Sequence, residues 1–383
     1  LSLSGNRFRG SIPAIANLNL RSIQLQENML TGTLSSSITI LTSLTVFFVG
    51  SNSLHGRLPD LRNLRNLTEL GVQKNKFSGS IPTDFFVNAS QLKVVLMYDN
   101  HFSGDLSFVD RIGSTELTMV DLSTNAFTGT MPSAVFVVSQ HSLVVFAVAV
   151  NCLSGDIPAT ICEARHLETL VLSSLTSGEA CREPYWEGTA FANRDGWDAF
   201  AVSNYMTGSL PMCIFGLANL TDVFIGGNNL AGDLSDAYFS PSLKQVMVAK
   251  NNLVGTIPSS VSGLVRATKV DFSSNYIRGG LKEIGNLLAL HISKYPALKN
   301  LYLKLRLNYL SGPIPPDLVE MKSKVDILAG NVYDCKGIKL LKSRDDYFDK
   351  YSCGSRAVDI ITTAFSGVVA MALHGGVLAI VTK

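Results

Sequence analysis

Apolar and polar residues alternate in short runs along most of the chain, and each run ends at an asparagine. Two examples are Leu67-x-x-Leu70-x-Val72-x-x-Asn75 and Leu117-x-x-Val120-x-Leu122-x-x-Asn125. Alternation over so few residues predicts a short β-strand with one apolar side. The pattern therefore predicts many short strands, each followed by a turn.

The run belongs to a longer repeat in which Asn-x-apolar-x-Gly is often followed by Ile-Pro, as at Ile81-Pro82 and Ile257-Pro258. Most intervals are 22 to 26 residues, and copies begin at Asn6, Asn28, Asn52, Asn75, Asn100, Asn125, Asn151, Asn204, Asn228, Asn251, Asn275 and Asn308, with a degenerate copy at Asn331. A unit of about 24 residues cannot bury a core alone, so successive coils must stack. Stacking predicts one parallel sheet and a ladder of asparagine amides that bond neighbouring backbones.

The consensus LxxLxLxxNxLxGxIPxxLxxL resembles the plant-type leucine-rich repeat of receptor-like proteins and receptor kinases, over residues 1–335. The resemblance implies an α/β repeat: a right-handed solenoid with a parallel β-sheet on its concave face. The segments Ile161-Cys162, Leu210-Pro211-Met-Cys213 and Tyr351-Ser-Cys353 are also similar to those of repeat-bearing surface proteins of protozoa.

The repeat is interrupted between Asn151 and Asn204, where the interval of 53 residues equals one repeat plus 29. We expect the strand at 167–172 to be intact and the insertion, residues 175–203, to leave from its end beside the concave face. Aromatic residues on such a loop are common binding anchors, although they can also pin the loop to the scaffold. The candidates for a ligand contact here are Tyr185, Trp186, Phe191 and Trp197.

Further candidates lie on the strands, where residues between the leucines face solvent on the concave side. Large apolar side chains at such positions indicate an interaction surface, unless the register of the degenerate repeats is misjudged. They are Phe48, Leu96, Val145, Phe224 and Met247.

The six cysteines and three N-glycosylation sequons favour the secretory pathway. The sequons are at Asn66, Asn88 and Asn219. Cys335 and Cys353 flank a polar stretch that would cap the last coil, and we expect them to be paired. Cys181 is expected to bridge either Cys162 or Cys213; alternatively, Cys162 and Cys213 are free, buried thiols.

The C-terminal stretch 360–382 has no formal charge and, as a helix of about 34 Å, is long enough for a hydrocarbon core. We expect a solenoid at 1–335, a cap and juxtamembrane stretch at 336–357, and a single transmembrane helix at 358–383, with the repeats extracellular. A lipid anchor after Gly354 and Ser355 is the alternative, although its polar spacer is short. No signal peptide precedes the first repeat, and we expect the natural N-terminus to lie further upstream.

Charge balance and the search for catalytic motifs exclude several classes of function. With 32 Lys and Arg against 30 Asp and Glu, and no basic run interleaved with aromatics, nucleic acid is not an expected partner. We find no catalytic, cofactor or metal-ligand motif. The sequence predicts a surface recognition module for a protein, peptide or glycan ligand, acting with a signalling co-receptor because it has no kinase domain. A secreted inhibitor or structural coat protein is the alternative.

Overall fold

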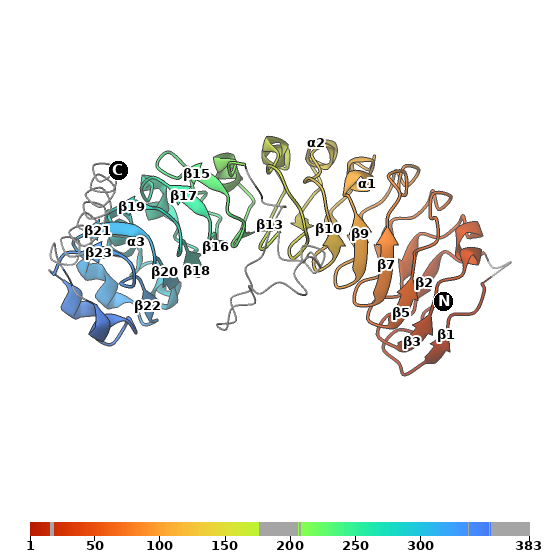
Figure 1. Cartoon of the computed structure of the whole chain (residues 1–383), viewed down its shortest axis with the longest axis horizontal. Coiled ribbons are helices and arrows are strands. Elements are labelled where there is room, and N and C mark those ends of the chain that lie inside the picture. Colours follow the sequence, from red (N-terminus) through yellow and green to blue (C-terminus); the bar gives the residue numbers. More distant parts are fainter. Residues whose placement is uncertain (16–18, 176–205, 207, 336, 352, 354–383) are drawn as a thin grey trace, which may run out of the picture. The chain divides into compact units, whose positions relative to one another are not determined.

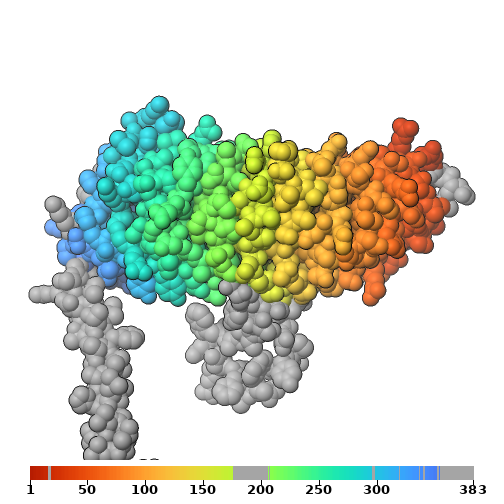
Figure 2. All heavy atoms as spheres, turned by 90° about the horizontal axis from the view of Figure 1, so that it is seen from above, coloured from red at the N-terminus to blue at the C-terminus, as the bar shows by residue number. Residues whose placement is uncertain are grey.

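The computed structural model describes residues 1–383 except 16–18, 176–205, 207, 336, 352 and 354–383 (Figure 1). It divides into two compact units. The first contains residues 1–232 and 237–252, and the second contains residues 233–236 and 253–383. In Figure 2 the coils of the first unit form successive bands that follow the order of the sequence.

One short strand from each coil joins a parallel sheet, as the alternating pattern predicts. In the first unit these strands are β2 (Ser22–Gln24), β4 (Val46–Phe48), β6 (Glu69–Gly71), β8 (Val94–Leu96), β10 (Met119–Asp121), β12 (Val145–Ala147), β13 (Thr169–Val171), β14 (Asp222–Phe224) and β16 (Gln245–Met247). In the second unit they are β18 (Lys269–Asp271), β20 (Tyr302–Lys304) and β22 (Val325–Asp326). The central residue of each three-residue strand is buried, and this row of side chains fills the core.

A second strand follows the turn in many coils. These strands are β1 (Arg9–Ser11), β3 (Met29–Gly32), β5 (Ser53–Gly56), β7 (Lys76–Ser80), β9 (His101–Gly104), β11 (Ala126–Phe127), β15 (Ala231–Asp233), β17 (Asn252–Val254), β19 (Arg278–Gly279), β21 (Tyr309–Gly312) and β23 (Val332–Tyr333). The apolar residue two positions after each asparagine lies in this part of the coil. Phe77, Phe102 and Phe127 stack there, with ring centroids 6.2 Å apart at each step.

Short helices complete the coils. They are α1 (Ser107–Asp110), α2 (Ala134–Val138), α3 (Lys282–His291), η1 (Ser36–Ile40), η2 (Ala159–Glu163), η5 (Met212–Gly216), η6 (Ser259–Gly263), η7 (Pro296–Asn300), η8 (Pro316–Glu320), η9 (Ile338–Leu341) and η10 (Phe348–Lys350). Pro158 and Pro258 directly precede η2 and η6 in an extended conformation, and Pro315 directly precedes η8. Because proline fixes φ, the repeated Ile-Pro ends the extended stretch at the same place in each coil.

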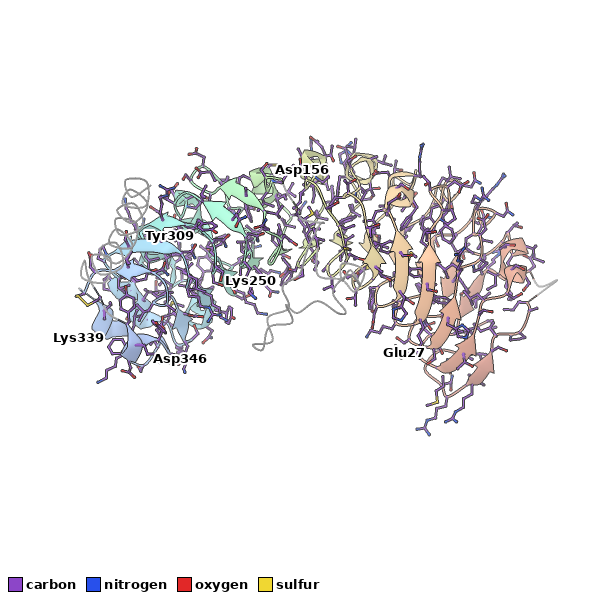
Figure 3. All side chains as sticks on the ribbon, in the orientation of Figure 1. Glu27, Asp156, Lys250, Tyr309, Lys339 and Asp346 are labelled. Atoms are coloured by element: carbon purple, nitrogen blue, oxygen red, sulfur yellow. A yellow bond between two sulfur atoms is a disulfide. The ribbon has the colours of Figure 1, made fainter. Side chains whose placement is uncertain are left out.

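Buried asparagines form the expected ladder, and Asn125 is typical. Its amide nitrogen donates to the carbonyl oxygens of Met97, Leu122 and Ser123 at 3.0 to 3.2 Å, and its oxygen accepts from the Phe102 N–H at 3.0 Å. The residue before each ladder asparagine turns the chain in the left-handed region, as at Glu27 with φ 59° (labelled in Figure 3). One side chain thus ties the turn of its own coil to the coil before it.

The ladder of asparagine side chains is interrupted where the insertion begins. Asn204, counted as a ladder residue from its motif, lies outside the described residues. The ladder position after β13 is occupied by Leu175, which is fully buried. Two observations show this: Leu175 N–H donates to Asn228 Oδ1 at 2.7 Å, and the Asn228 amide donates to Leu172 O at 2.7 Å. The Leu153 N–H, whose counterparts bond an asparagine oxygen, bonds the Leu175 carbonyl oxygen at 2.8 Å instead.

The last coil of the second unit is covered by a cap after Tyr333. Cys335 and Cys353 form a disulfide with their Cα atoms 5.0 Å apart. The Tyr351 hydroxyl accepts from Tyr333 N–H at 2.6 Å and donates to Asn331 O at 3.1 Å. Cap and coil are therefore joined by both a covalent bond and hydrogen bonds.

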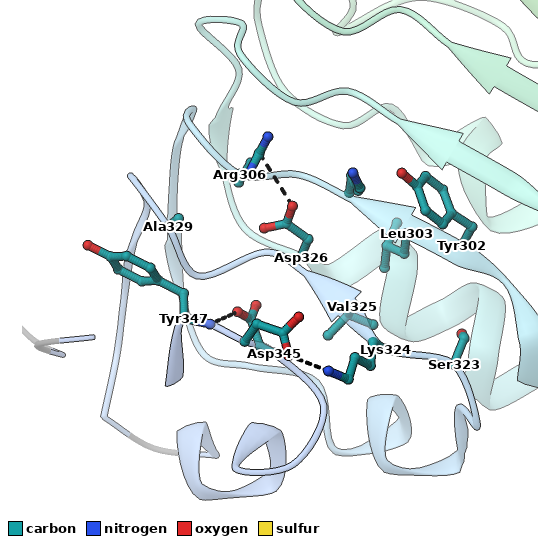
Figure 4. A pocket seen from close by; sticks show the side chains of 12 residues that line it. Tyr302, Leu303, Arg306, Ser323, Lys324, Val325, Asp326, Ala329, Asp345 and Tyr347 are labelled. Carbon is teal, nitrogen blue, oxygen red and sulfur yellow. Dashed lines mark hydrogen bonds and ion pairs between the residues drawn. The ribbon is translucent and has the colours of Figure 1, made fainter. Parts of the chain in front are cut away.

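Two adjacent aspartates of the cap, Asp345 and Asp346, have opposite environments. Asp345 is only 4% exposed. Its Oδ2 accepts from the N–H groups of Ile327 and Leu328 at 2.8 and 3.0 Å, and its Oδ1 accepts from Tyr347 N–H at 2.9 Å. Asp346, in contrast, is exposed and pairs with Lys324 at the surface (Figure 4).

The expected transmembrane helix, residues 358–383, lies outside the described residues. Within the part of the chain that the structure does describe, no helix is both long and apolar enough to cross a membrane.

Candidate binding surface on the strand sheet

The residues on either side of each buried strand centre form one open face of the sheet in the first unit. The first position of each strand forms one row: Ser22, Val46, Glu69, Val94, Met119, Val145, Thr169, Asp222 and Gln245. The third position forms a parallel row: Gln24, Phe48, Gly71, Leu96, Asp121, Ala147, Val171, Phe224 and Met247. We call these two rows the open sheet face.

All five strand candidates named from the sequence lie on the open sheet face. Phe48, Leu96, Phe224 and Met247 occupy the third-position row, and Val145 occupies the first. Each is half-buried, so each presents part of its side chain to solvent. Phe224 and Met247 are cross-strand neighbours, whereas Phe48 and Leu96 are separated by the strand that carries Gly71.

Glycines shape the N-terminal part of this face. The Phe48 ring lies over Gly71, where an added Cβ would overlap the ring atoms Cδ1 and Cε1. The Gln73 side chain lies over Gly50 in the same way, with its amide atoms 2.6 to 2.8 Å from the position of an added Cβ. The Gln26 and Gln73 side-chain oxygens are buried, and no described residue bonds them. Two glycines therefore let large side chains lie flat on the sheet.

Most residues of the open sheet face are uncharged, and the acidic residues Asp222 and Asp121 differ in their hydrogen bonds. Asp222 accepts from the Gln245 amide at 2.7 Å, so this pair is hydrogen-bonded across the strands. Asp121 lies between Leu96 and Ala147 in its row. Burial is the main cause that raises the pKa of Asp121 above its ordinary value, and its bond from Ser123 N–H opposes the shift.

The aromatic candidates Tyr185, Trp186, Phe191 and Trp197 lie outside the described residues, as does Cys181. The described chain leaves the ladder at Leu175 and is seen again at Met206, which forms a parallel bridge with Gly155. The structure therefore describes where the insertion begins and ends in the fold.

Neither alternative for the central cysteines was right. Cys162 and Cys213 are bonded to each other, with Cα atoms 5.9 Å apart. They lie in η2 and η5, the helices of consecutive coils, and stacking brings them together although 51 residues separate them in sequence. Cys152 is also disulfide-bonded.

The three sequon asparagines share one kind of contact. All are exposed, and each side-chain amide donates to a backbone carbonyl oxygen of an earlier coil: Asn66 to Thr42 at 2.9 Å, Asn88 to Arg62 at 3.1 Å and Asn219 to Arg165 at 2.8 Å. The amide that would carry a glycan thus lies at a coil junction on the surface.

The second unit contains a cavity of about 480 Å³ that the sequence did not predict (Figure 4). It is formed by β20, β22 and the cap, and Tyr302, Lys304, Arg306, Asp326, Asp345 and Tyr347 contribute to its wall. Arg306 pairs with Asp326 at 3.3 Å, and the Lys304 ammonium lies 5.0 Å from the centroid of the Tyr302 ring. The charges of Lys304-Leu-Arg306 were visible in the sequence, but their meeting with the cap was not.

Among the residues that the structure describes, no group of three or more His, Cys, Asp or Glu side chains is arranged to hold a metal ion.

No protein-family model matches the chain. Among curated proteins, it is 33% identical over 137 residues to Receptor-like protein 18 of Arabidopsis thaliana, covering 35% of this chain and 16% of that protein. It is 27% identical over 261 residues to the Arabidopsis Receptor-like kinase TMK2, covering 66% of this chain and 26% of that protein. The chain thus spans about a quarter or less of the length of these relatives.

Solved structures share the fold. The Arabidopsis receptor kinase HAESA, solved with the peptide hormone IDA and the co-receptor SERK1, matches with a TM-score of 0.71 and 24% identity, covering 90% of this chain and 56% of that one. A TDR receptor matches with a TM-score of 0.70 and 25% identity, covering 86% and 51%. The repeat and the ladder of buried asparagines thus form a leucine-rich-repeat solenoid, and the chain is similar to plant receptor-like proteins over part of their length.

Proposed function

We propose that the chain is a recognition ectodomain that binds a peptide ligand on the open sheet face. The observation that carries the proposal is the apolar, half-buried set on that face, with Val171, Phe224 and Met247 on three adjacent strands. Contiguous exposed apolar surface on a rigid scaffold is typical of interaction sites. The peptide hormones named with solved relatives support the ligand class.

An extended peptide suits this face because it is long and narrow. Neighbouring strands of a sheet lie about 4.8 Å apart, so a ligand that crosses five strands spans on the order of 20 Å. The strands are already paired on both sides within the sheet, so recognition would depend on side chains rather than on strand addition. The co-receptor of the HAESA complex makes a second protein a fitting partner for signal transmission.

Replacement of both Phe224 and Met247 by alanine tests the site. We expect at least a 30-fold rise in the Kd of a peptide selected on the wild-type protein, since a buried apolar anchor contributes about 2 kcal/mol. The measurement is calorimetric titration, with the thermal midpoint checked in parallel. Tyr238→Ala is the matched control, because this residue is 59% exposed and lies off the open sheet face. Equal affinities of the double variant and the wild type would refute the site.

The inserted segment extends this proposal. We propose that four aromatic residues of this segment contact the same ligand as the open sheet face: Tyr185, Trp186, Phe191 and Trp197. On that face the ligand would contact Val145 and Phe224 and, on other strands of the sheet, Phe48, Leu96 and Met247. The double replacement of Trp186 and Trp197 by alanine belongs in the same titration. Loss of binding with an unchanged thermal midpoint supports a contact, whereas unfolding would identify the two tryptophans as packing residues.

We also propose a cell-surface location, with residues 358–383 as a membrane anchor and glycans on Asn66, Asn88 and Asn219. The support is the uncharged stretch 360–382 together with receptor-like relatives. The protein is then expected to stay with membranes after carbonate washing and after treatment with a phosphatidylinositol-specific phospholipase. Release by the phospholipase would indicate a lipid anchor instead, and recovery in the carbonate supernatant would exclude both.

A further inference from the structure

Asp121 is a carboxylate in an apolar part of the open sheet face. In its own row its neighbours are Leu96 on β8 and Ala147 on β12. The first-position residues of the same three strands are Val94, Met119 and Val145, and all three are half-buried. A charge among such side chains loses much of its hydration, and that loss requires compensation from a bond or an opposite charge.

The compensation within the described part of the chain is small. The Asp121 carboxylate accepts hydrogen bonds from Ser123, through its N–H at 3.0 Å and its hydroxyl, and it forms no ion pair with any described residue. A carboxylate has about four acceptor positions. About half of these positions are therefore left without a donor from the described residues.

The second unit contains an aspartate at the equivalent strand position, and there a neighbouring lysine compensates the negative charge. Asp271 occupies the third position of β18 and accepts from Ser273 N–H at 3.0 Å, which is the turn contact that Asp121 makes. In its row, however, Asp271 pairs in register with Lys304, and Lys304 pairs with Asp326. The cation thus lies between two anions in its row. The pKa of Lys304 is raised mainly by its hydrogen bond with Tyr302, and the charges of Asp271 and Asp326 add to the shift.

The comparison of Asp121 with Asp271 separates two roles of an aspartate at this position: its oxygen bonds the turn, and its charge interacts with neighbouring strands. The Asp-x-Ser turn accounts for one oxygen of each carboxylate, and it needs an acceptor but no net charge. The row of β18, β20 and β22 adds a lysine to compensate the charge, whereas the row of β8, β10 and β12 has Leu96 and Ala147 in the corresponding places.

We propose that Asp121 selects the ligand: the open sheet face binds a peptide segment with a lysine or arginine side chain opposite Asp121 and apolar side chains on both sides of it. This inference rests on the proposed function and specifies its ligand. A ligand cation would take the place that Lys304 has beside Asp271, while Val94, Leu96, Met119 and Val145 would contact the neighbouring apolar residues. The bound pair is shielded from water, so its attraction exceeds that of an exposed pair.

The test uses a library of random linear peptides displayed on phage and selected against the full chain. We expect the enriched peptides to share one Lys or Arg between apolar residues. For one such peptide, Asp121→Asn is expected to raise the Kd about tenfold or more, because a charge-assisted bond becomes a neutral one. The asparagine keeps a side-chain oxygen for Ser123 N–H, so the fold is preserved. Asp121→Lys is expected to enrich peptides with Glu or Asp instead.

The matched control is Glu163→Gln, since Glu163 lies on η2, outside the open sheet face, with an exposed side chain, and the change removes one negative charge as Asp121→Asn does. It is expected to change the Kd less than twofold. A peptide with methionine in place of its basic residue should bind wild type and Asp121→Asn equally, which shows that the two charges act on each other.

The outcomes separate the two proposals. If selected peptides lose affinity when Phe224 and Met247 are replaced but bind Asp121→Asn as well as wild type, the function stands and the role of Asp121 is refuted. Equal losses in Asp121→Asn and Glu163→Gln would also refute it, because the effect would then be one of overall charge. If no peptide is enriched, or binding is insensitive to every one of these replacements, both proposals fail.

Discussion

Replacement of Asn125 by alanine is expected to lower the free energy of unfolding by about 2–3 kcal/mol. Asn125 is 5% exposed and makes four hydrogen bonds, three through its amide nitrogen and one through its oxygen. Without it, the buried Phe102 N–H loses its partner, whereas the carbonyl oxygens of Met97 and Leu122 each keep a donor, the amides of Asn100 and Asn151. Each orphaned buried group costs about 1–3 kcal/mol. Urea denaturation followed by circular dichroism measures the change.

Asn6→Ala is the control for this experiment. Asn6 has the same place in its repeat, but it is exposed, and its amide donates only to Leu3 O and Ser4 O at 3.1 Å. Water can replace these bonds, so the expected loss is below about 0.5 kcal/mol. If Asn125→Ala cost no more than Asn6→Ala, the ladder would follow from the stacking of coils rather than stabilise it.

Replacement of Asp345 by alanine is expected to open the C-terminal end of the second unit, with a loss of about 3–4 kcal/mol. The carboxylate is the acceptor for three N–H groups, two of them in the last coil, and removal of a charged partner from buried donors is among the more costly single changes. Because a repeat protein unfolds from its ends when a cap is weakened, the loss should be local. Hydrogen exchange at the amides of Ile327 and Leu328 is the direct measurement.

Two further variants serve as controls for the Asp345→Ala experiment. Asp346→Ala removes an exposed carboxylate, with a side chain 80% accessible, and its surface pair with Lys324 is expected to contribute less than about 1 kcal/mol. Asp345→Asn keeps one acceptor oxygen and should fall between the two. Unchanged exchange at Ile327 and Leu328 in Asp345→Ala would show that the disulfide and Tyr351 hold the cap without it.

The periodic part of the fold could be read from the sequence because each residue of the repeat has a local reason to be there. The spacing of Leu67, Leu70 and Val72 defines a strand with one buried side, and Asn75 follows at the turn. Stacking then repeats one environment, so the apolar residues that break the expected polar pattern, such as Phe224 and Met247, could be placed on the open face without coordinates.

The errors arose where the next coil, and not the local sequence, decides the role of a residue. Leu175 occupies the ladder position after β13, and the register of β13 with its neighbours, rather than a motif, places it there. The pairing of Cys162 with Cys213 follows from the stacking of η2 on η5, and no local pattern states it.

By itself, therefore, the sequence determined the class of fold, the place of the strands and the face that carries the apolar candidates, because these depend on periodicity within one coil. Only the tertiary structure decided which charges are compensated. Asp121, Asp271 and Asp345 look alike in sequence, but their surroundings differ. Asp271 lies beside Lys304 of the next coil, and Asp345 accepts three backbone N–H groups. Asp121 has its turn contact with Ser123 but no opposite charge among the described residues. Partners that depend on packing between coils cannot be read from one coil alone.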